Sequence, residues 1–94
     1  MASEVWADSQ KTRYKHAIQA AWDDFEAAYY ACIKRVGIQS MAATHAANYM
    51  RRARILKEMV ETLLSKPTYS ATAPQAIRNA VAELVEFKQA LNRL

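Results

Sequence analysis

The sequence predicts an all-α protein, a three-helix up-down-up bundle with a long first helix. Three observations lead to this prediction. The 94 residues include one glycine and two prolines, so the backbone has few places to turn and its elements must be long. Apolar residues recur in steps of three and four, which is the spacing of one face of a helix. Hydrophobic residues make up 52% of the chain, which is enough for a packed core.

The first helix is predicted at residues 3–36. Ser3 is a suitable N-cap, and the acidic residues after it favour the start of a helix. Gly37 follows two basic residues and is a typical helix stop. The apolar stripe between these signals alternates steps of four and three: Ile18, Trp22, Phe25, Tyr29, Cys32 and Val36. Because Cys32 is the single cysteine and lies on this stripe, we expect a buried thiol and no internal disulfide.

The second helix is predicted at residues 40–64, with Ser40 as its N-cap and Pro67 beyond its end. A small, polar linker follows over residues 66–73. The third helix is predicted at residues 74–93, because Pro74 suits a first turn and Thr72 is a candidate cap. Short turns between three such helices predict one domain over residues 1–94.

The first helix is longer than the other two and is expected to overhang them. An overhang favours self-association, so we expect a homo-oligomer. Trp6 lies on the overhanging end and is predicted to contact another protein or a second copy. Val81 and Val85 lie beside the apolar seam of the third helix and are predicted to face a second chain.

The link between the first two helices has the residues of a helix-turn-helix unit. Such a unit buries the residues around its turn glycine and exposes polar residues from its second helix. Apolar residues occupy the positions that this unit buries: Cys32, Val36, Ile38, Ala43 and Ala46. Polar residues occupy the positions that face outward: Gln39, Ser40, Thr44, His45 and Asn48. Arg51, Arg52, Arg54 and Lys57 follow them.

Residues 29–54, which include the stretch KRVGIQSMAATHAANYMRRAR, resemble the helix-turn-helix of phage repressors and of phage terminase small subunits. The resemblance implies an oligomer that contacts DNA through Gln39, Ser40, Thr44 and Asn48, with the arginines near the phosphate backbone. Both flanking helices are longer than is usual in that motif. The alternative is an ordinary αα-hairpin in which Gly37 only reverses the chain between antiparallel helices.

The charge pattern favours an anionic partner. The net charge is +4, and no acidic residue occurs between Glu26 and Glu58, an interval with six basic residues. A hairpin would gather this charge at one end, as phosphate binding requires. The competing interpretation is a solvated basic face with weak pairs such as that of Lys57 and Glu61.

The sequence lacks the motifs of common catalytic sites. It contains no glycine-rich phosphate loop and no HExxH, and neither His16 nor His45 has ligand partners at metal-binding spacing. We therefore expect no enzyme, no cofactor and no metal. Because no apolar run is long enough to span a bilayer and no secretory signal begins the chain, we expect no membrane contact and a cytoplasmic location.

The sequence therefore predicts a small helical regulator that binds duplex DNA. The hairpin and the basic residues after it would form the binding surface, through Gln39, Ser40, Thr44, Asn48, Arg51, Arg52, Arg54 and Lys57. The alternative is a protein-binding adaptor or inhibitor that makes no contact with nucleic acid.

Overall fold

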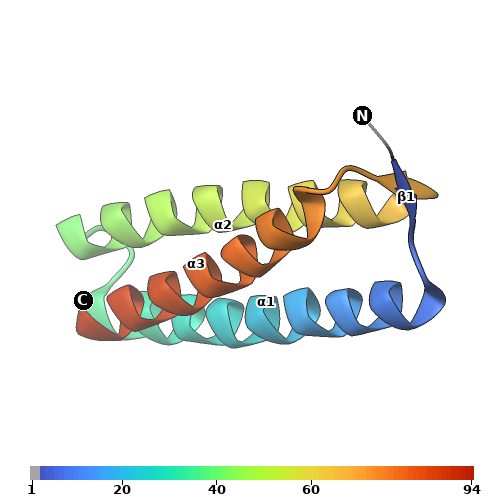
Figure 1. The fold of residues 1–94 in the computed structure, drawn as a ribbon. Coiled ribbons are helices and arrows are strands. Elements are labelled where there is room, and N and C mark those ends of the chain that lie inside the picture. The colour runs from blue at the N-terminus through green and yellow to red at the C-terminus, as the bar shows by residue number, and fades with distance from the viewer. Residues whose placement is uncertain (1–2) are drawn as a thin grey trace.

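The computed structural model describes residues 3–94 as three long helices and two short strands (Figure 1). These are β1 (Glu4–Val5), α1 (Asp8–Val36), α2 (Met41–Ser65), β2 (Thr68–Tyr69) and α3 (Ala73–Arg93). α2 runs antiparallel to α1, and α3 returns in the direction of α1 (Figure 1). The molecule is a rod of 49 × 22 × 17 Å. The predicted all-α bundle of three helices is confirmed.

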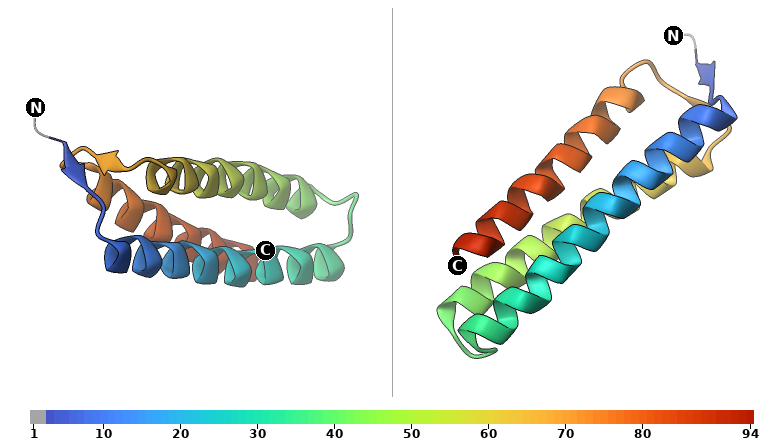
Figure 2. Two further views of the ribbon diagram at one scale, coloured as in Figure 1. Left: turned by 90° about the vertical axis from the view of Figure 1, so that its right-hand side faces the viewer. Right: turned by 90° about the horizontal axis from the view of Figure 1, so that it is seen from below.

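One apolar core holds the three helices together. α1 and α3 form one layer, and α2 packs over them (Figure 2). The largest fully buried side chains come from all three helices: Phe25, Cys32, Val60, Leu64, Ile77, Leu84 and Leu91. No polar or charged side chain of residues 3–94 is buried, so the hydrophobic effect dominates the stability of the bundle.

The predicted apolar stripe of the first helix is confirmed. Ile18, Phe25 and Cys32 are buried, and Trp22, Tyr29 and Val36 are half-buried against the same core. The thiol of Cys32 is free and has no solvent exposure. A step of three or four residues therefore kept each of these side chains on the face that meets α2 and α3.

The turn between α1 and α2 follows the expected helix signals. Gly37 has φ 84° and ψ 141°, a backbone conformation that residues with a Cβ rarely adopt. Its N–H donates to the Ile33 carbonyl at 2.9 Å and closes α1. The Ser40 hydroxyl accepts from the Ala43 N–H at 3.0 Å, so the predicted N-cap of α2 is confirmed.

The start of the first helix differs from the prediction. α1 begins at Asp8, whereas the sequence signals placed its start at Ser3. Glu4 and Val5 instead pair antiparallel with Tyr69 and Thr68. These strand contacts, between residues more than 60 positions apart, outweigh the local preference of Ser3 and Glu4 for a helix start. Gln10 caps the actual start by accepting from the Ala7 N–H at 3.1 Å.

Trp6 closes this end of the bundle. We call residues 4–6 and 67–69 together the clasp. The indole Nε1–H of Trp6 donates to the Leu63 carbonyl at 3.1 Å, and the Trp6 backbone N–H donates to the Pro67 carbonyl at 3.2 Å. The indole stacks on the Tyr69 ring with centroids 3.8 Å apart and meets the Tyr14 ring edge-on at 5.8 Å. Trp6 is 4% exposed, so the prediction that it lies on a free interface is wrong.

The start of α3 also departs from one expectation. Pro74 lies in the first turn, as predicted. Thr72 is the N-cap residue, but its side chain makes no capping hydrogen bond. Its hydroxyl is instead 3.0 Å from the hydroxyl of Ser70, at the end of the linker.

We predict that Trp6→Ala lowers the free energy of unfolding by about 3 kcal/mol, because it removes a buried aromatic side chain and leaves a cavity. Urea denaturation followed by circular dichroism measures the change. The control is Val5→Ala at the neighbouring position, because Val5 is 73% exposed and its replacement should have little effect. Equal effects of the two substitutions would contradict the described position of Trp6.

A pH-dependent prediction follows from the second aromatic residue of the clasp. The Tyr69 hydroxyl donates to Glu4 Oε2 at 2.8 Å, and this bond is the main reason that the pKa of Tyr69 is raised above its ordinary value of 10.0. A raised pKa in the folded state stabilises the protein below the unfolded pKa, and this contribution is lost as the pH rises through the folded pKa. We expect the stability difference between the wild type and Tyr69→Phe to shrink above about pH 10.

Denaturation at a series of pH values tests this expectation. Tyr30→Phe is the control, because Tyr30 is 62% exposed and makes no contact with the clasp. A difference between the wild type and Tyr69→Phe that stays constant from about pH 8 to about pH 11 would contradict the role of the Glu4 bond.

Candidate nucleic-acid interface

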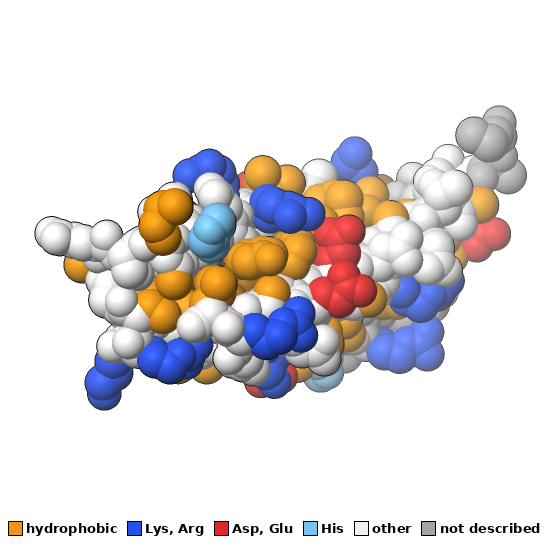
Figure 3. Space-filling model, turned by 90° about the vertical axis from the view of Figure 1, so that its left-hand side faces the viewer, with side chains coloured by type: hydrophobic (Ala, Val, Ile, Leu, Met, Phe, Trp, Pro, Cys, Tyr) orange, Lys and Arg blue, Asp and Glu red, His pale blue; other side chains and the backbone are white. Residues whose placement is uncertain are grey.

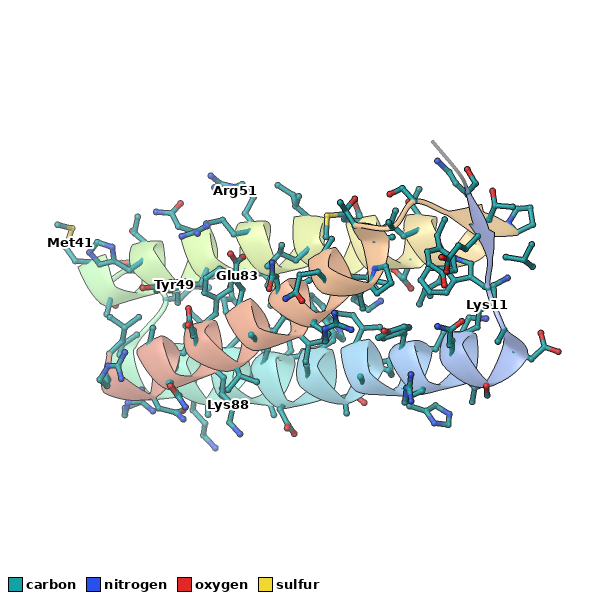
Figure 4. All side chains as sticks on the ribbon, viewed as in Figure 1. Lys11, Met41, Tyr49, Arg51, Glu83 and Lys88 are labelled. Carbon is teal, nitrogen blue, oxygen red and sulfur yellow. The ribbon has the colours of Figure 1, made fainter. Side chains whose placement is uncertain are left out.

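The outer side of α2 carries several of the predicted site residues. α1 and α3 both lie on the other side of α2, so this face is open to solvent (Figure 2). Thr44, Asn48 and Arg51 follow one another in steps of four and three, and all are exposed. This spacing places them in one line along the helix. Arg51 points away from the bundle (Figure 4).

Two further arginines flank this line. Arg52 and Arg54 are exposed and lie two positions apart, so their side chains leave α2 about 200° apart around its axis. The Arg52 guanidinium lies 4.8 Å from the centre of the Phe87 ring, which places it on the side of α3. The outer line therefore has a basic residue along each edge. We call Thr44, Asn48, Arg51, Arg52 and Arg54 the α2 basic face.

Three other predicted site residues do not join this face. The Ser40 hydroxyl caps α2 and donates to the Gly37 carbonyl at 2.8 Å, so its hydrogen-bonding capacity is used locally. The Lys57 ammonium lies 5.4 Å from the Trp22 ring centre and 3.4 Å from Glu61, which holds it against α1. Gln39 is exposed in the turn, beyond the end of the outer line.

The hairpin differs from the expected helix-turn-helix arrangement. Cys32, Ala43 and Ala46 are buried as predicted. Ile38, however, is 81% exposed, so the prediction that it packs under the turn is wrong. α1 and α2 lie antiparallel along their length, and the chain reverses directly at Gly37 (Figures 1 and 2). An antiparallel pair leaves nothing beneath the turn for Ile38 to cover, so the alternative of an αα-hairpin describes this segment.

The predicted protein-interface residues of α3 are placed differently from one another. Val81 is half-buried and packs against the core. Val85 is 44% exposed and remains available on the surface. With Trp6 buried, these three residues do not form one surface.

The fold adds basic residues to the hairpin end that the sequence did not assign to it. Arg35 near the end of α1 donates to the Leu91 carbonyl at 3.0 Å and ties the last turn of α3 to α1. The C-terminal part of α3, with Lys88 and Arg93, therefore lies at the end of the bundle where α1 and α2 are joined. The hairpin residues 27–57 at this end contain no acidic residue. Acidic side chains on the face in Figure 3 gather from the middle of the rod onward, away from the hairpin.

The length of the predicted third helix was the signal for this placement. A helix of about 20 residues that runs antiparallel to α2 must end beside the first turns of α2. The predicted helix lengths gave the expected overhang of the first helix, but the end of the third helix was not placed from them.

Two kinds of site are absent from the described part of the chain. Residues 3–94 contain no group of three or more His, Cys, Asp or Glu side chains placed to hold a metal ion. In the same range, no helix has both the length and the apolarity that crossing a bilayer requires.

We predict that Ile38→Ala changes the free energy of unfolding by less than about 0.5 kcal/mol, because the side chain is already exposed. The control is Ile77→Ala, which removes a side chain with no solvent exposure and should lower the free energy by about 3 kcal/mol. Urea denaturation measures both variants. A loss at Ile38 as large as that at Ile77 would restore the interpretation of a buried turn.

Comparison with known proteins adds no family to these observations. No protein-family model, curated protein or solved structure matches the chain. The resemblance of residues 29–54 to the helix-turn-helix of phage proteins stays a prediction from the sequence. The function of the chain is therefore inferred from its own residues.

Proposed function

We propose that this protein binds duplex DNA through the α2 basic face. The observation that carries the proposal is the exposed line of Thr44, Asn48 and Arg51 on the open side of α2, within an interval that has no acidic residue. Arginine and asparagine are side chains that make paired hydrogen bonds to guanine and adenine edges. The flanking arginines supply the charge that phosphate contacts need.

The shape of α2 supports a groove-binding arrangement. An α-helix with its side chains is about 10–12 Å across, and the major groove of B-DNA is about 12 Å wide. A helix in this groove has a phosphate backbone on either side. Arg52 and Arg54 leave α2 in nearly opposite directions, so each is suited to one of these two backbones. The outer line between them faces the base edges in this arrangement.

The acidic residues of α2 limit the extent of this surface. Glu58 is exposed one turn beyond Arg54, and Glu61 pairs with Lys57 at 3.4 Å. A carboxylate near a phosphate backbone is repelled. The proposed contact therefore covers the N-terminal half of α2 and ends near Ile55.

A second candidate function is protein binding through the hairpin tip. Ile38 and Met41 are 81% and 78% exposed and lie three positions apart at the turn. Exposed apolar side chains at a protrusion are typical of contacts with another protein or a second copy. Under this alternative the tip residues, and not the arginines, determine the affinity for the partner.

We expect Arg51→Ala combined with Arg54→Ala to weaken binding to duplex DNA and to flatten its salt dependence. Loss of the phosphate contact of Arg54 lowers the slope of log K against log salt by about 0.9, and loss of Arg51 removes a contact with base edges. Fluorescence anisotropy with a random duplex at about 50 and about 200 mM salt measures both quantities. The matched control is Lys15→Ala combined with Lys66→Ala, which removes the same charge from exposed positions near the clasp.

The two proposals give different results in this assay. DNA binding through the α2 basic face requires the arginine variant to bind more weakly than the lysine variant. Equal binding by the two variants, or no binding of the wild type at the lower salt, would reject it. Ile38→Ser with Met41→Ser should leave DNA affinity unchanged, and a loss of self-association in light scattering would support the second candidate.

A further inference from the structure

A shallow cavity opens between α2 and the end of α3, beside the α2 basic face. It has a volume of about 360 Å³ and is lined by His45, Asn48, Tyr49, Arg52 and Leu94. The four α2 residues lie within about 100° of one another around the helix axis, so they follow the edge of α2 next to α3, with Asn48 nearest the outer side. We call this cavity the α2–α3 pocket.

The polar side chains of this pocket have unused hydrogen-bonding capacity. Within residues 3–94, His45, Asn48, Tyr49 and Arg52 make no side-chain hydrogen bond and no ion pair. Between them they carry imidazole, amide, phenol and guanidinium donors. No carboxylate side chain lines the pocket, since Glu83 and Glu86 of α3 lie outside its lining. The Arg52 guanidinium carries only donors and a permanent positive charge, so an oxyanion suits it as a ligand.

Packing holds two of these side chains in place before any ligand binds. The Arg52 guanidinium lies over the Phe87 ring at 4.8 Å, a contact that leaves the N–H groups at its edge available. Tyr49 is half-buried, with its ring centre 5.3 Å from that of Phe87, and lies between α2 and α3 (Figure 4). Phe87 is 6% exposed and therefore fixed in the core. A preplaced donor loses less conformational entropy when it binds a ligand.

We propose that the α2–α3 pocket binds a phosphoryl group, through Arg52, His45, Asn48 and Tyr49. The planar fork of an arginine matches two phosphate oxygens, and the three other side chains can each donate to a remaining oxygen. A phosphoryl group fills only part of the volume. The aliphatic side chain of Leu94 and the ring of Tyr49 are left to contact the atoms to which the phosphate is attached.

The phosphoryl group has two possible sources. It is either a backbone phosphate of DNA, in which case the inference rests on the function proposed above, or a free phosphomonoester, in which case it is independent of that function. Asn48 belongs to both the pocket and the α2 basic face, so a DNA duplex bound to this face would have a backbone phosphate near the pocket.

Substitution of two adjacent arginines tests the pocket. Arg52→Gln removes the guanidinium that lines it, and Arg51→Gln makes the same chemical change one position away, outside the lining. The probes are inorganic phosphate, a nucleoside 5′-monophosphate and a duplex DNA, each titrated in NMR spectra of the 15N-labelled full chain. We expect phosphate affinity to fall about tenfold or more in Arg52→Gln, and to change less than about twofold in Arg51→Gln.

A second variant tests the pocket with less risk of changing the fold. Arg52→Gln also removes the contact with Phe87, so circular dichroism must show that the variant keeps its helices. Tyr49→Phe keeps the ring and removes only the hydroxyl, and it should also weaken phosphate binding. Phosphate-induced shifts that are no larger at His45 and Tyr49 than around Lys15, or equal losses in the two arginine variants, would overturn the proposal.

The three probes separate the two sources and the two proposals. Phosphate and DNA affinities that both fall in Tyr49→Phe, which changes the pocket and leaves the α2 basic face intact, support a backbone phosphate. A fall in monophosphate affinity with unchanged DNA affinity supports a free phosphomonoester. DNA binding without any phosphate binding at the pocket overturns this inference and leaves the proposed function intact. Phosphate binding without DNA binding overturns the proposed function and leaves this inference intact.

Discussion

The indole of Trp6 is the contact on which the N-terminal end of the bundle depends. It joins three segments that are far apart in the chain: the first strand, the end of α2 and the linker before α3. At this end the α2–α3 linker turns beside the start of α1, and Trp6 with Tyr69 packs between them. Because the core contains no buried polar side chain within residues 3–94, apolar contacts of this kind carry most of the stability. The opposite end is left free to carry charge.

The sequence predicted the helices well because their signals are local. Gly37, Ser40 and Pro74 marked ends that depend on the few residues around them, and the alternating steps from Ile18 to Val36 depend only on helical geometry. The start of α1 was wrong because Ser3 and Glu4 carry a local helix signal that a pairing with Tyr69 and Thr68 overrides. No local pattern contains information about a partner more than 60 residues away.

The candidate site was predicted in part for the same reason. Thr44, Asn48 and Arg51 are polar residues opposite an alanine-rich stripe, so their exposure followed from helical periodicity. The exposure of Ile38 depends on how two helices cross, and the role of Arg52 depends on Phe87, a residue of another helix. The pocket beside it requires Leu94 to lie next to His45, which only the assembled bundle establishes. Sequence reasoning therefore found the face of α2 and missed its edge with α3.

The position of Cys32 gives the molecule an internal reporter of its own motions. The thiol has no solvent exposure and lies on the α1 stripe that meets the rest of the core, so a thiol reagent can reach it only when the helices separate. The rate of its modification is then set by the free energy of opening at the hairpin end. A ligand that binds only the closed bundle slows that reaction as its occupancy rises, whatever its chemical identity. The modification rate of the single cysteine thus reports both transient opening of the core and the binding of a ligand on the surface.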